Sequence, residues 1–270
     1  MSLPAATPAR TAIVTGASSG IGAEIARELA ARGHGVTLVA RRADRLEELA
    51  EELRGLGVRA EVLATDLNDR EARAALPRRV EELGLEPHIL VNNAGLSTLG
   101  AIAKGDPEAE MRMIEVDVVA VADLCSRFLP GMVERRAGAV LNVASTAAFQ
   151  PLPGQAGYAA CKAFVLSYTR SLHGELAGTG VTATALCPGP VKTGFGEAAG
   201  ITEEDAEKAL PKFLWEDADS VARCGLDGLA KGHPVAIPGL ANRLGANLAH
   251  LVPKRLLVPI LSRQHPALRD

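Results

Sequence analysis

Short apolar runs alternate with amphipathic stretches along most of the chain. Segments such as 23–32, 45–53 and 70–83 repeat Ile, Leu and Ala every three or four residues amid Arg and Glu, which predicts helices with one buried face. Between them lie apolar runs with little polar alternation, as expected of strands that are covered on both faces. These runs are residues 12–14, 36–39, 58–63, 89–91, 140–143 and 181–186.

The alternation of strand and helix is typical of βαβ units, because crossover helices of about ten or more residues let neighbouring strands run parallel. We therefore predict an α/β fold with a single doubly wound parallel sheet and helices on both faces, a Rossmann fold. No repeat and no Ser/Gly-rich linker divides the sequence, so residues 1–270 are expected to form one dinucleotide-binding domain. Residues 194–215 and the C-terminal extension 239–270 fall outside the alternation.

The amino-acid composition and the net charge indicate what kind of molecule the protein binds. With 47% apolar and 23% charged residues, the chain can bury a sizeable core, which excludes an intrinsically disordered protein. The formal net charge of −3, with basic and acidic residues interleaved, gives no electrostatic reason for a nucleic acid or an anionic membrane to be the main partner. The expected ligand is a small molecule.

The cysteines and the N-terminus indicate the compartment. Cys125, Cys161, Cys187 and Cys224 stand far apart without partners at zinc-ligand spacing, so we expect reduced thiols and no metal site. Residues 1–10 lack the charged and apolar regions of a signal peptide, and no run of about 18 apolar residues could span a bilayer. The expected location is therefore the cytoplasm.

A glycine-rich loop follows the first predicted strand and leads directly into a helix. Gly16, Gly20 and Gly22 allow the backbone to turn sharply and to approach a pyrophosphate, while the helix N-terminus faces the anion. At the first strand of a βαβ series, this spacing predicts nucleotide binding rather than a plain turn. The loop lacks the Gly-Lys-Ser/Thr sequence of an ATP-type P-loop.

The second strand ends in Ala40, Arg41 and Arg42, about 20 residues beyond the loop, where a dinucleotide fold contacts the adenosine ribose. A carboxylate there would bind the ribose hydroxyls and repel a 2′-phosphate, whereas guanidinium groups bind a phosphate. Arg41 and Arg42 thus favour NADP over NAD. Alternatively, Arg41 and Arg42 are solvated charged residues at the start of the next helix, because Asp44 and Arg45 continue the run of charged residues.

Tyr158 and Lys162 lie four residues apart at the start of an apolar helical run, so they share one helix face. An ammonium group one turn from a phenol favours the phenolate and lowers the phenol pKa from its usual value of about 10. The Tyr-x-x-x-Lys pattern is common by chance, so it indicates a catalytic pair only in combination with the other motifs of the chain.

Five motifs in order resemble the classical short-chain dehydrogenase/reductase family, and the resemblance spans about residues 10–237. They are Thr15-Gly16-x-x-x-Gly20-Ile21-Gly22, Asn92-Asn93-Ala94-Gly95, Asn142-Val143-Ala144-Ser145, Tyr158-x-x-x-Lys162 and Pro188-Gly189-Pro190-Val191-Lys192-Thr193.

The resemblance implies roles for individual residues. Tyr158 would be the general acid/base, Ser145 would hydrogen-bond the substrate oxygen, and Lys162 would lower the pKa of Tyr158 and hold the nicotinamide ribose. The cofactor would be NADP. Its contacts would come from Gly16, Ser18, Ser19, Gly20, Ile21, Gly22, Arg41, Arg42, Asp66, Leu67, Asn93, Ala94, Gly95, Tyr158, Lys162, Pro188, Gly189, Val191 and Thr193.

Asp117 departs from the family pattern. Members usually place an Asn there, in the helix before the fifth strand, and its backbone carbonyl holds a water in the proton relay to the lysine. That carbonyl survives the substitution, but the carboxylate of Asp117 adds a negative charge near Lys162, so Asp117 joins the candidate catalytic residues.

The resulting hypothesis is an NADP(H)-dependent oxidoreductase that interconverts an alcohol and a carbonyl on a small to medium apolar substrate. The alternative is an NADP-binding protein that has lost its catalytic activity and acts as a regulator or scaffold. Asp117 is the only residue that supports this alternative. Another Rossmann-like enzyme, such as a methyltransferase, would explain neither the Tyr158/Lys162 pair nor the two arginines.

By the same resemblance, residues 194–215 form a substrate lid. Its large apolar side chains indicate either an apolar pocket or packing of the lid on the core. They are Phe195, Phe213, Leu214 and Trp215, and by position Leu96, Ser97, Ala147 and Gln155 complete the pocket.

The C-terminal extension is rich in leucine and basic residues, and Pro253 and Pro259 interrupt it. These prolines favour covering of the core or contact with a second subunit over peripheral contact with a membrane. A homodimer or homotetramer is expected.

Overall fold

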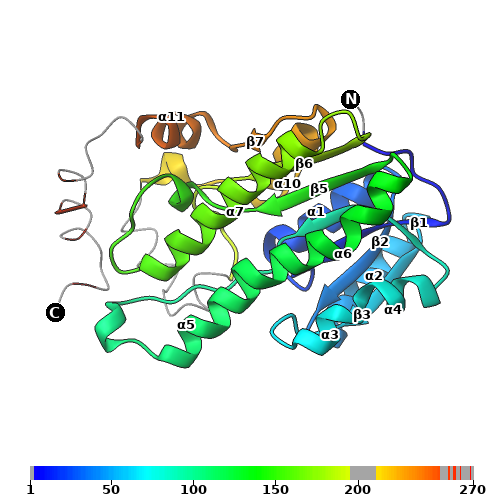
Figure 1. Ribbon diagram of the computed structural model, residues 1–270, viewed down its shortest axis with the longest axis horizontal. Coiled ribbons are helices and arrows are strands. Elements are labelled where there is room, and N and C mark those ends of the chain that lie inside the picture. The colour runs from blue at the N-terminus through cyan, green and yellow to red at the C-terminus, as the bar shows by residue number, and fades with distance from the viewer. Residues whose placement is uncertain are drawn as a thin grey trace.

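A seven-stranded sheet forms the centre of the computed structural model, which describes residues 3–194 and 211–249 and the tail positions 255, 258, 259, 262 and 268. The strand order is β3-β2-β1-β4-β5-β6-β7, and neighbouring strands run parallel (Figure 1). This arrangement confirms the predicted doubly wound α/β fold. The strands are β1 Arg10–Thr15, β2 Gly35–Ala40, β3 Ala60–Ala64, β4 Glu86–Asn92, β5 Gly138–Val143, β6 Val181–Leu186 and β7 Val235–Ala236.

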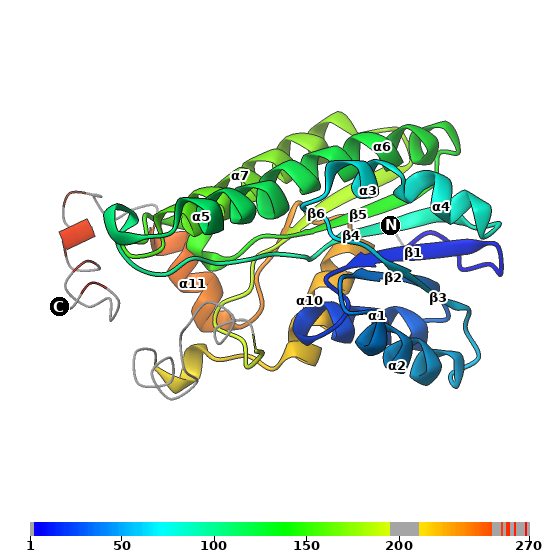
Figure 2. The same cartoon turned by 90° about the horizontal axis from the view of Figure 1, so that it is seen from below.

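Helices cover both faces of the sheet. Helices α1, α2 and α10 pack on one face, and α4, α6 and α7 pack on the other (Figure 2). Segment η2 is a π-helix, and the other η segments are short 3₁₀ helices. The helical segments are α1 Gly20–Ala31, α2 Ala43–Arg54, α3 Arg70–Ala74, α4 Leu76–Glu82, η1 Ile102–Lys104, α5 Pro107–Ile114, η2 Glu115–Val119, α6 Ala120–Glu134, η3 Thr146–Phe149, α7 Ala156–Glu175, η4 Lys212–Leu214, α10 Ala218–Ala230 and α11 Leu240–Ala249.

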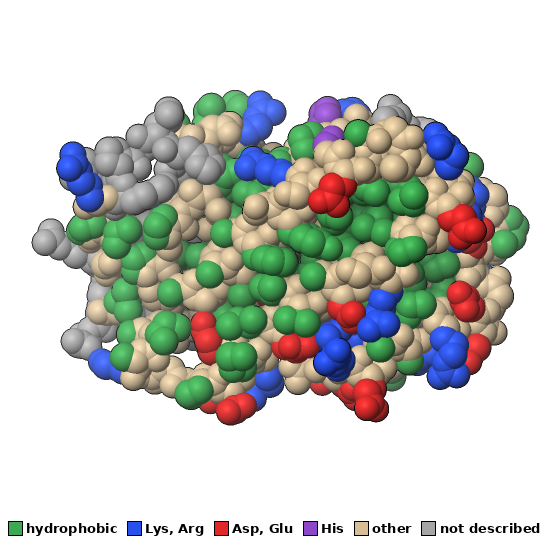
Figure 3. Space-filling view, viewed as in Figure 1, with side chains coloured by type: hydrophobic (Ala, Val, Ile, Leu, Met, Phe, Trp, Pro, Cys, Tyr) green, Lys and Arg blue, Asp and Glu red, His purple; other side chains and the backbone are tan. Residues whose placement is uncertain are grey.

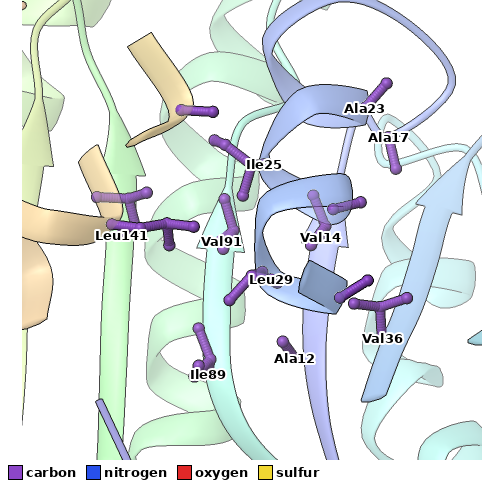
Figure 4. Close-up of a cluster of buried hydrophobic side chains, with 14 of the residues drawn as sticks. Ala12, Val14, Ala17, Ala23, Ile25, Leu29, Val36, Ile89, Val91 and Leu141 are labelled. Carbon is purple, nitrogen blue, oxygen red and sulfur yellow. The ribbon is translucent and has the colours of Figure 1, made fainter. Parts of the chain in front are cut away.

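The strands are apolar on both faces because each face meets a helical layer. In β1, Val14 packs with Ile25 and Leu29 of α1 (Figure 4). The neighbouring residue Ile13 belongs to the separate cluster under α4 and α6. These four side chains are fully buried. Successive strand residues point to opposite faces, so burial on both sides removes the polar alternation from the sequence.

Two elements differ from the sequence prediction. The sequence analysis did not predict strand β7, because two residues are too few to give a pattern of apolar and polar positions. The predicted helix 70–83 is two helices, α3 and α4, that meet at Ala75. Pro77 causes the break, since it has no N–H for the carbonyl of Arg73 and is tolerated only in the first turn of a helix.

Part of the predicted lid and tail lies outside the described residues. This applies to residues 1–2, to residues 195–210 with Phe195, and to residues 250–270 apart from the five tail positions named above.

Candidate active site and cofactor cleft

The candidate site lies along the carboxyl edge of the sheet, where several strands end in loops. Gly16 follows β1, Asn93 follows β4, Ser145 follows β5 and Pro188 follows β6. The strand order changes direction between β1 and β4, which is where open α/β sheets form a ligand crevice. Motifs that are far apart in the sequence therefore meet at one edge.

Glycine is required at Gly16, in the loop between β1 and α1, and at Gly22, in the first turn of α1. Gly16 adopts a φ of 65°, in the left-handed region that favours glycine. A Cβ on Gly16 would lie 2.8 Å from Ala94 Cα, and one on Gly22 would overlap the Gly16 carbonyl oxygen. The glycine-rich loop thus packs directly against the loop that follows β4.

Thr15 and Asn93 lock these two loops together. The Thr15 hydroxyl accepts hydrogen bonds from the Asn93 and Ala94 amides at 2.9 and 3.1 Å and donates one to the Val91 carbonyl at 3.1 Å. The Asn93 side-chain amide donates to the Thr15 carbonyl at 3.0 Å. Predicted cofactor contacts from β1 and β4 therefore share one rigid support.

The N-terminus of α1 is suited to an anion. Among the described residues, no side chain caps α1, whereas Asp69 and Asp106 accept hydrogen bonds from first-turn amides of α3 and α5. The first N–H groups of a helix need acceptors and carry the positive end of its dipole. A phosphate beside the glycine-rich loop would supply that acceptor.

Arg42 lies at the opening of the glycine-rich loop. Its Nη2 donates to Ser19 Oγ at 2.9 Å and to Ser18 Oγ at 3.0 Å. Arg41 and Arg42 are both exposed at the end of β2. The structure thus places Arg42 in direct contact with two predicted cofactor-binding serines, Ser18 and Ser19.

Other predicted cofactor contacts frame the same crevice. Asp66 is exposed after β3 and Leu67 is buried beside it. From the β6 side, Thr193 approaches the loop so closely that a Cβ on Gly20 would lie 3.1 Å from Thr193 Cγ2. Val191 pairs with a residue just before α10 through an isolated parallel bridge. The segment after β6 therefore faces the glycine-rich loop across the crevice.

Ser145, Tyr158 and Lys162 converge at the carboxyl end of β5. Ser145 Oγ accepts a hydrogen bond from the Ala147 amide at 3.1 Å. The Ser145 side chain also forms a hydrogen bond with the Tyr158 hydroxyl. Helix α7 presents Tyr158 and Lys162 on one face, with Nζ 5.6 Å from the centre of the Tyr158 ring. A hydroxyl, a phenol and an ammonium group thus share one small site.

Asp117 binds Lys162 directly. The Asp117 side chain is fully buried in η2, and its Oδ2 lies 2.8 Å from Lys162 Nζ. Its Oδ1 accepts a hydrogen bond from the Leu96 amide at 2.7 Å, and Nζ donates to the Val143 carbonyl at 3.3 Å. A Cβ on Gly95 would lie 3.2 Å from both charged groups, so Gly95 provides the space for this ion pair.

Burial and the nearby charges together shift the pKa values of this site. Burial raises the pKa of Tyr158 above its usual value, although Lys162 acts in the opposite direction and Asp117 adds to the rise. The expected effect of Lys162 is present, but desolvation of the phenolate is larger, so the net change in the pKa of Tyr158 is a rise. Burial acts to lower the pKa of Lys162, but Asp117 and Tyr158 raise it above its usual value. Burial likewise raises the pKa of Asp117, against the effect of Lys162.

Arg73 supports the π-helix and was not found by the sequence analysis. It is 1% exposed in α3 and forms ion pairs with Glu115 of η2 at 2.9 Å and with Asp123 of α6 at 2.8 Å. It also donates to the Leu67 carbonyl at 2.6 Å. Buried arginines need such partners, and a lone Arg among charged helical residues gives no sequence signal of burial.

A buried amide network holds α7 against the sheet. Asn92 Nδ2 donates to Asn142 Oδ1 at 2.8 Å, and Asn142 Nδ2 donates to Thr169 Oγ1 at 2.9 Å. The sequence motifs contain both asparagines, but only the structure gives them a role. The network joins the ends of β4 and β5 to the helix that carries Tyr158 and Lys162.

The predicted pocket residues lie near this site with different exposures. Gln155 Nε2 donates to Ser97 Oγ at 2.9 Å, which ties the start of α7 to the loop after β4. Leu214 and Trp215 are half-buried, whereas Phe213 is 70% exposed. Packing of this part of the predicted lid on the protein therefore leaves the Phe213 ring in solvent.

The described part of the chain shows no three His, Cys, Asp or Glu residues arranged to hold a metal ion. All four cysteines are free, and three of them are buried. None of the helices in the described ranges is long and apolar enough to cross a lipid bilayer.

Comparison with known proteins places these features in context. A family model described as short chain dehydrogenase matches residues 10–204. A short chain dehydrogenase of Pseudocercospora fijiensis is 40% identical over 206 residues, which cover 72% of this chain and 66% of the relative.

Solved structures are similar over most of their length. A short-chain dehydrogenase from Sphingobium yanoikuyae in complex with NADPH is 34% identical, with a TM-score of 0.79, and the match covers 92% of this chain and 95% of that one. The bulky-bulky ketone specific alcohol dehydrogenase from Comamonas testosteroni is 29% identical, with a TM-score of 0.74 and coverages of 96% and 93%.

Proposed function

Because the chain belongs to the short chain dehydrogenase family, we propose that it is an NADP(H)-dependent oxidoreductase that interconverts an alcohol and a carbonyl on an apolar substrate. The observation that carries this proposal is the convergence of Ser145, Tyr158 and Lys162 beside the glycine-rich loop. These side chains can position a substrate oxygen and exchange a proton with it.

The crevice fits a dinucleotide. The glycine-rich loop leaves no room for side chains at Gly16 and Gly22, and the first turn of α1 offers amides to a phosphate. Arg41 and Arg42 favour a 2′-phosphate on the ribose, and the similar Sphingobium yanoikuyae structure contains NADPH. When bound, the cofactor donates or accepts the hydride at the substrate carbon.

The raised pKa of Tyr158 suits the reduction of a carbonyl. A protonated phenol at neutral pH would give its proton to the carbonyl oxygen of a bound substrate. Ser145 donates a hydrogen bond to the same oxygen, and the charge of Lys162 stabilises the phenolate that remains. The alcohol product carries the proton from Tyr158 on its oxygen.

The substrate is proposed to be a small to medium apolar ketone or aldehyde. Half-buried Leu214 and Trp215 supply apolar surface close to the segment that follows β6. The similar Comamonas testosteroni enzyme is named as specific for bulky ketones, which supports a carbonyl substrate here.

Cofactor preference can be tested by titration with NADPH and NADH. We expect Arg41→Ala to raise the NADPH dissociation constant by about ten- to a hundredfold, because it removes one or two charge-assisted hydrogen bonds, with little effect on NADH. Arg45→Ala is the matched control, since Arg45 is also exposed and lies in the same segment. Equal losses for both cofactors would contradict NADP preference.

Turnover can be tested with NADPH against a panel of ketones and aldehydes. Oxidation of NADPH that depends on an apolar carbonyl would support the proposed activity. Normal NADPH binding without turnover of any compound would favour the alternative of decayed catalysis. Failure to bind either nicotinamide cofactor would contradict both hypotheses.

The protein is further proposed to be a cytoplasmic homo-oligomer, either a dimer or a tetramer. The face in Figure 3 exposes many apolar side chains over α6 and α7. Val119 of η2 and Phe164 of α7 are each 38% exposed. Large exposed apolar surfaces often mark subunit contacts. Light scattering in solution would give the number of subunits.

A further inference from the structure

Helix α11 packs on the protein through a polar and a small side chain. Asn242 and Ala246 are each 5% exposed and lie four residues apart, on one face of the helix. Leu240, Leu244 and Leu248 lie on a different face, and each is more than half exposed. The contact between α11 and the core therefore depends on Asn242 and Ala246, and it leaves the leucines largely in solvent.

Asn242 contacts two segments that are far apart in the sequence. A Cβ on Gly189, in the segment that follows β6, would overlap the Asn242 carboxamide and lie 2.6 Å from its Nδ2. The same Nδ2 donates a hydrogen bond to the Leu214 carbonyl of η4 at 2.9 Å, and η4 packs against α11 (Figures 1 and 2). One buried amide thus joins the segment after β6 to the segment before α10.

These two segments also bond to each other beside Asn242. The Glu216 amide donates to the Pro190 carbonyl at 3.0 Å, and Glu216 pairs with Val191 through a parallel bridge. A Cβ on Gly239 would overlap the Glu216 carboxylate and lie 3.1 Å from Asn242 Nδ2. Gly239 therefore provides the space in which the two side chains approach each other.

The segment after β6 is bonded in turn to the loop that carries Ser145. The Pro188 carbonyl accepts a hydrogen bond from the Thr146 amide at 2.9 Å and lies 3.5 Å from Ser145 Oγ. Ala246 of α11 belongs to the same buried cluster as Phe149 of η3, which follows Ser145. Helix α11 thus supports both walls of the candidate site at the ends of β5 and β6.

We propose that Asn242 is a positioning residue that holds the segment after β6 and η4 in place for the nicotinamide half of the cofactor. This inference rests on the proposed function, which gives the cofactor its orientation. Arg42 and the glycine-rich loop would take the phosphates of the adenosine half, so the nicotinamide would lie towards Tyr158, on the side of Gly189. A buried amide with a fixed hydrogen-bond partner keeps its contacts in one arrangement.

Asn242→Asp tests this role, because it keeps the shape of the side chain but loses the donor to the Leu214 carbonyl and adds an anion beside Glu216. We expect the NADPH dissociation constant to rise about three- to tenfold, as for the loss of one hydrogen bond. The dissociation constant of adenosine 2′,5′-bisphosphate, which lacks the nicotinamide, should stay unchanged. Asn247→Asp is the matched control, since Asn247 is exposed on the same helix and undergoes the same change of charge.

A second measurement needs no cofactor. Trp215 is the only tryptophan of the chain, is half-buried and directly follows Leu214, so its fluorescence reports on η4. We expect Asn242→Asp to shift the Trp215 emission to longer wavelength, because release of η4 admits water to the indole, and Asn247→Asp to leave the emission unchanged. A role in stability alone would lower the thermal midpoint without this shift in the folded protein.

A pair of alanine substitutions tests the contact from its other side. Gly189→Ala should also weaken NADPH binding, because its methyl group would overlap the Asn242 carboxamide. Asn242→Ala vacates that space. The double variant should therefore bind NADPH no more weakly than Gly189→Ala, whereas multiplied losses would show that the two residues act independently and would overturn the proposal.

The remaining outcomes are equally decisive. Equal weakening of both nucleotides in Asn242→Asp, or unchanged NADPH affinity together with unchanged Trp215 emission, would overturn the proposal. If the unmodified protein binds neither nucleotide, the proposed function is contradicted, and the fluorescence then decides whether Asn242 holds η4. A shift confined to Asn242→Asp would support that role, and the absence of a shift would overturn it.

Discussion

The buried pair of His34 and His88 makes the stability of this protein depend on pH below neutrality. His88 is fully buried in β4, and its Nε2 lies 2.9 Å from Nδ1 of His34, just before β2. The two rings stack with their centres 5.1 Å apart. Burial lowers the pKa of His88 to about 4, and the nearby charges of His34, Arg10 and Arg135 add to this effect.

The size of the effect follows from the difference in pKa between the native and unfolded states. In the unfolded chain His88 has a pKa of about 6.5, so at lower pH the unfolded state takes up a proton that the native state does not. Stability is therefore fully present above about pH 6.5 and falls by about 1.4 kcal/mol per pH unit, to a total loss of about 3 kcal/mol near pH 4. Burial also lowers the pKa of His34, which acts in the same direction.

Urea unfolding, followed by circular dichroism between about pH 7.5 and pH 4.5, measures this dependence. The informative variant is His88→Gln, because glutamine can still hydrogen-bond to His34 but does not titrate. We expect it to be less stable than the unmodified protein at neutral pH and to lose less stability on acidification. The control is His233→Gln, since His233 is exposed after α10.

Carboxylates also titrate in the lower part of this range, but they are the same in all three proteins. The difference between the unmodified protein and His88→Gln therefore isolates the histidine pair. If the two proteins lose stability in parallel between neutrality and about pH 5, the native state protonates His88 readily and the reasoning from burial is refuted.

Three further predictions concern the site and its support. Tyr158→Phe should reduce carbonyl turnover by about a hundredfold or more while NADPH still binds, and retention of more than about a tenth of the activity would reveal another proton donor. Asp117→Asn should lower the pKa of Tyr158 by removing a nearby anion, so the acidic limb of alcohol oxidation should move to lower pH, and superimposable pH profiles would exclude the coupling. Arg73→Leu should destabilise the protein by about 2 kcal/mol in urea unfolding, because two partly exposed carboxylates lose their partner, whereas exposed Arg78→Leu should change stability by less than about 1 kcal/mol.

Local patterns in the sequence were sufficient for the fold and for much of the candidate site. Apolar runs without alternation identify six of the seven strands, because parallel strands under two helical layers are buried on both faces. Gly16 and Gly20 identify the glycine-rich loop in the sequence, since the left-handed backbone conformation at both positions favours glycine. Tyr158 and Lys162 share a helix face by spacing alone. In each case the information lies within a few consecutive residues.

Contacts between distant segments were decided only by the tertiary structure. The Asp117–Lys162 ion pair joins η2 to α7, and Arg73 joins α3 to η2 and α6. The local Tyr-x-x-x-Lys spacing gave the lowering effect of Lys162 on the pKa of Tyr158, but the larger rise depends on how much water the surrounding elements exclude. Likewise, α11 is amphipathic by sequence, but only its packing through Asn242 shows that the leucines face outward. Burial and charge pairing are sums over segments that the chain brings together on folding, and no local pattern contains them.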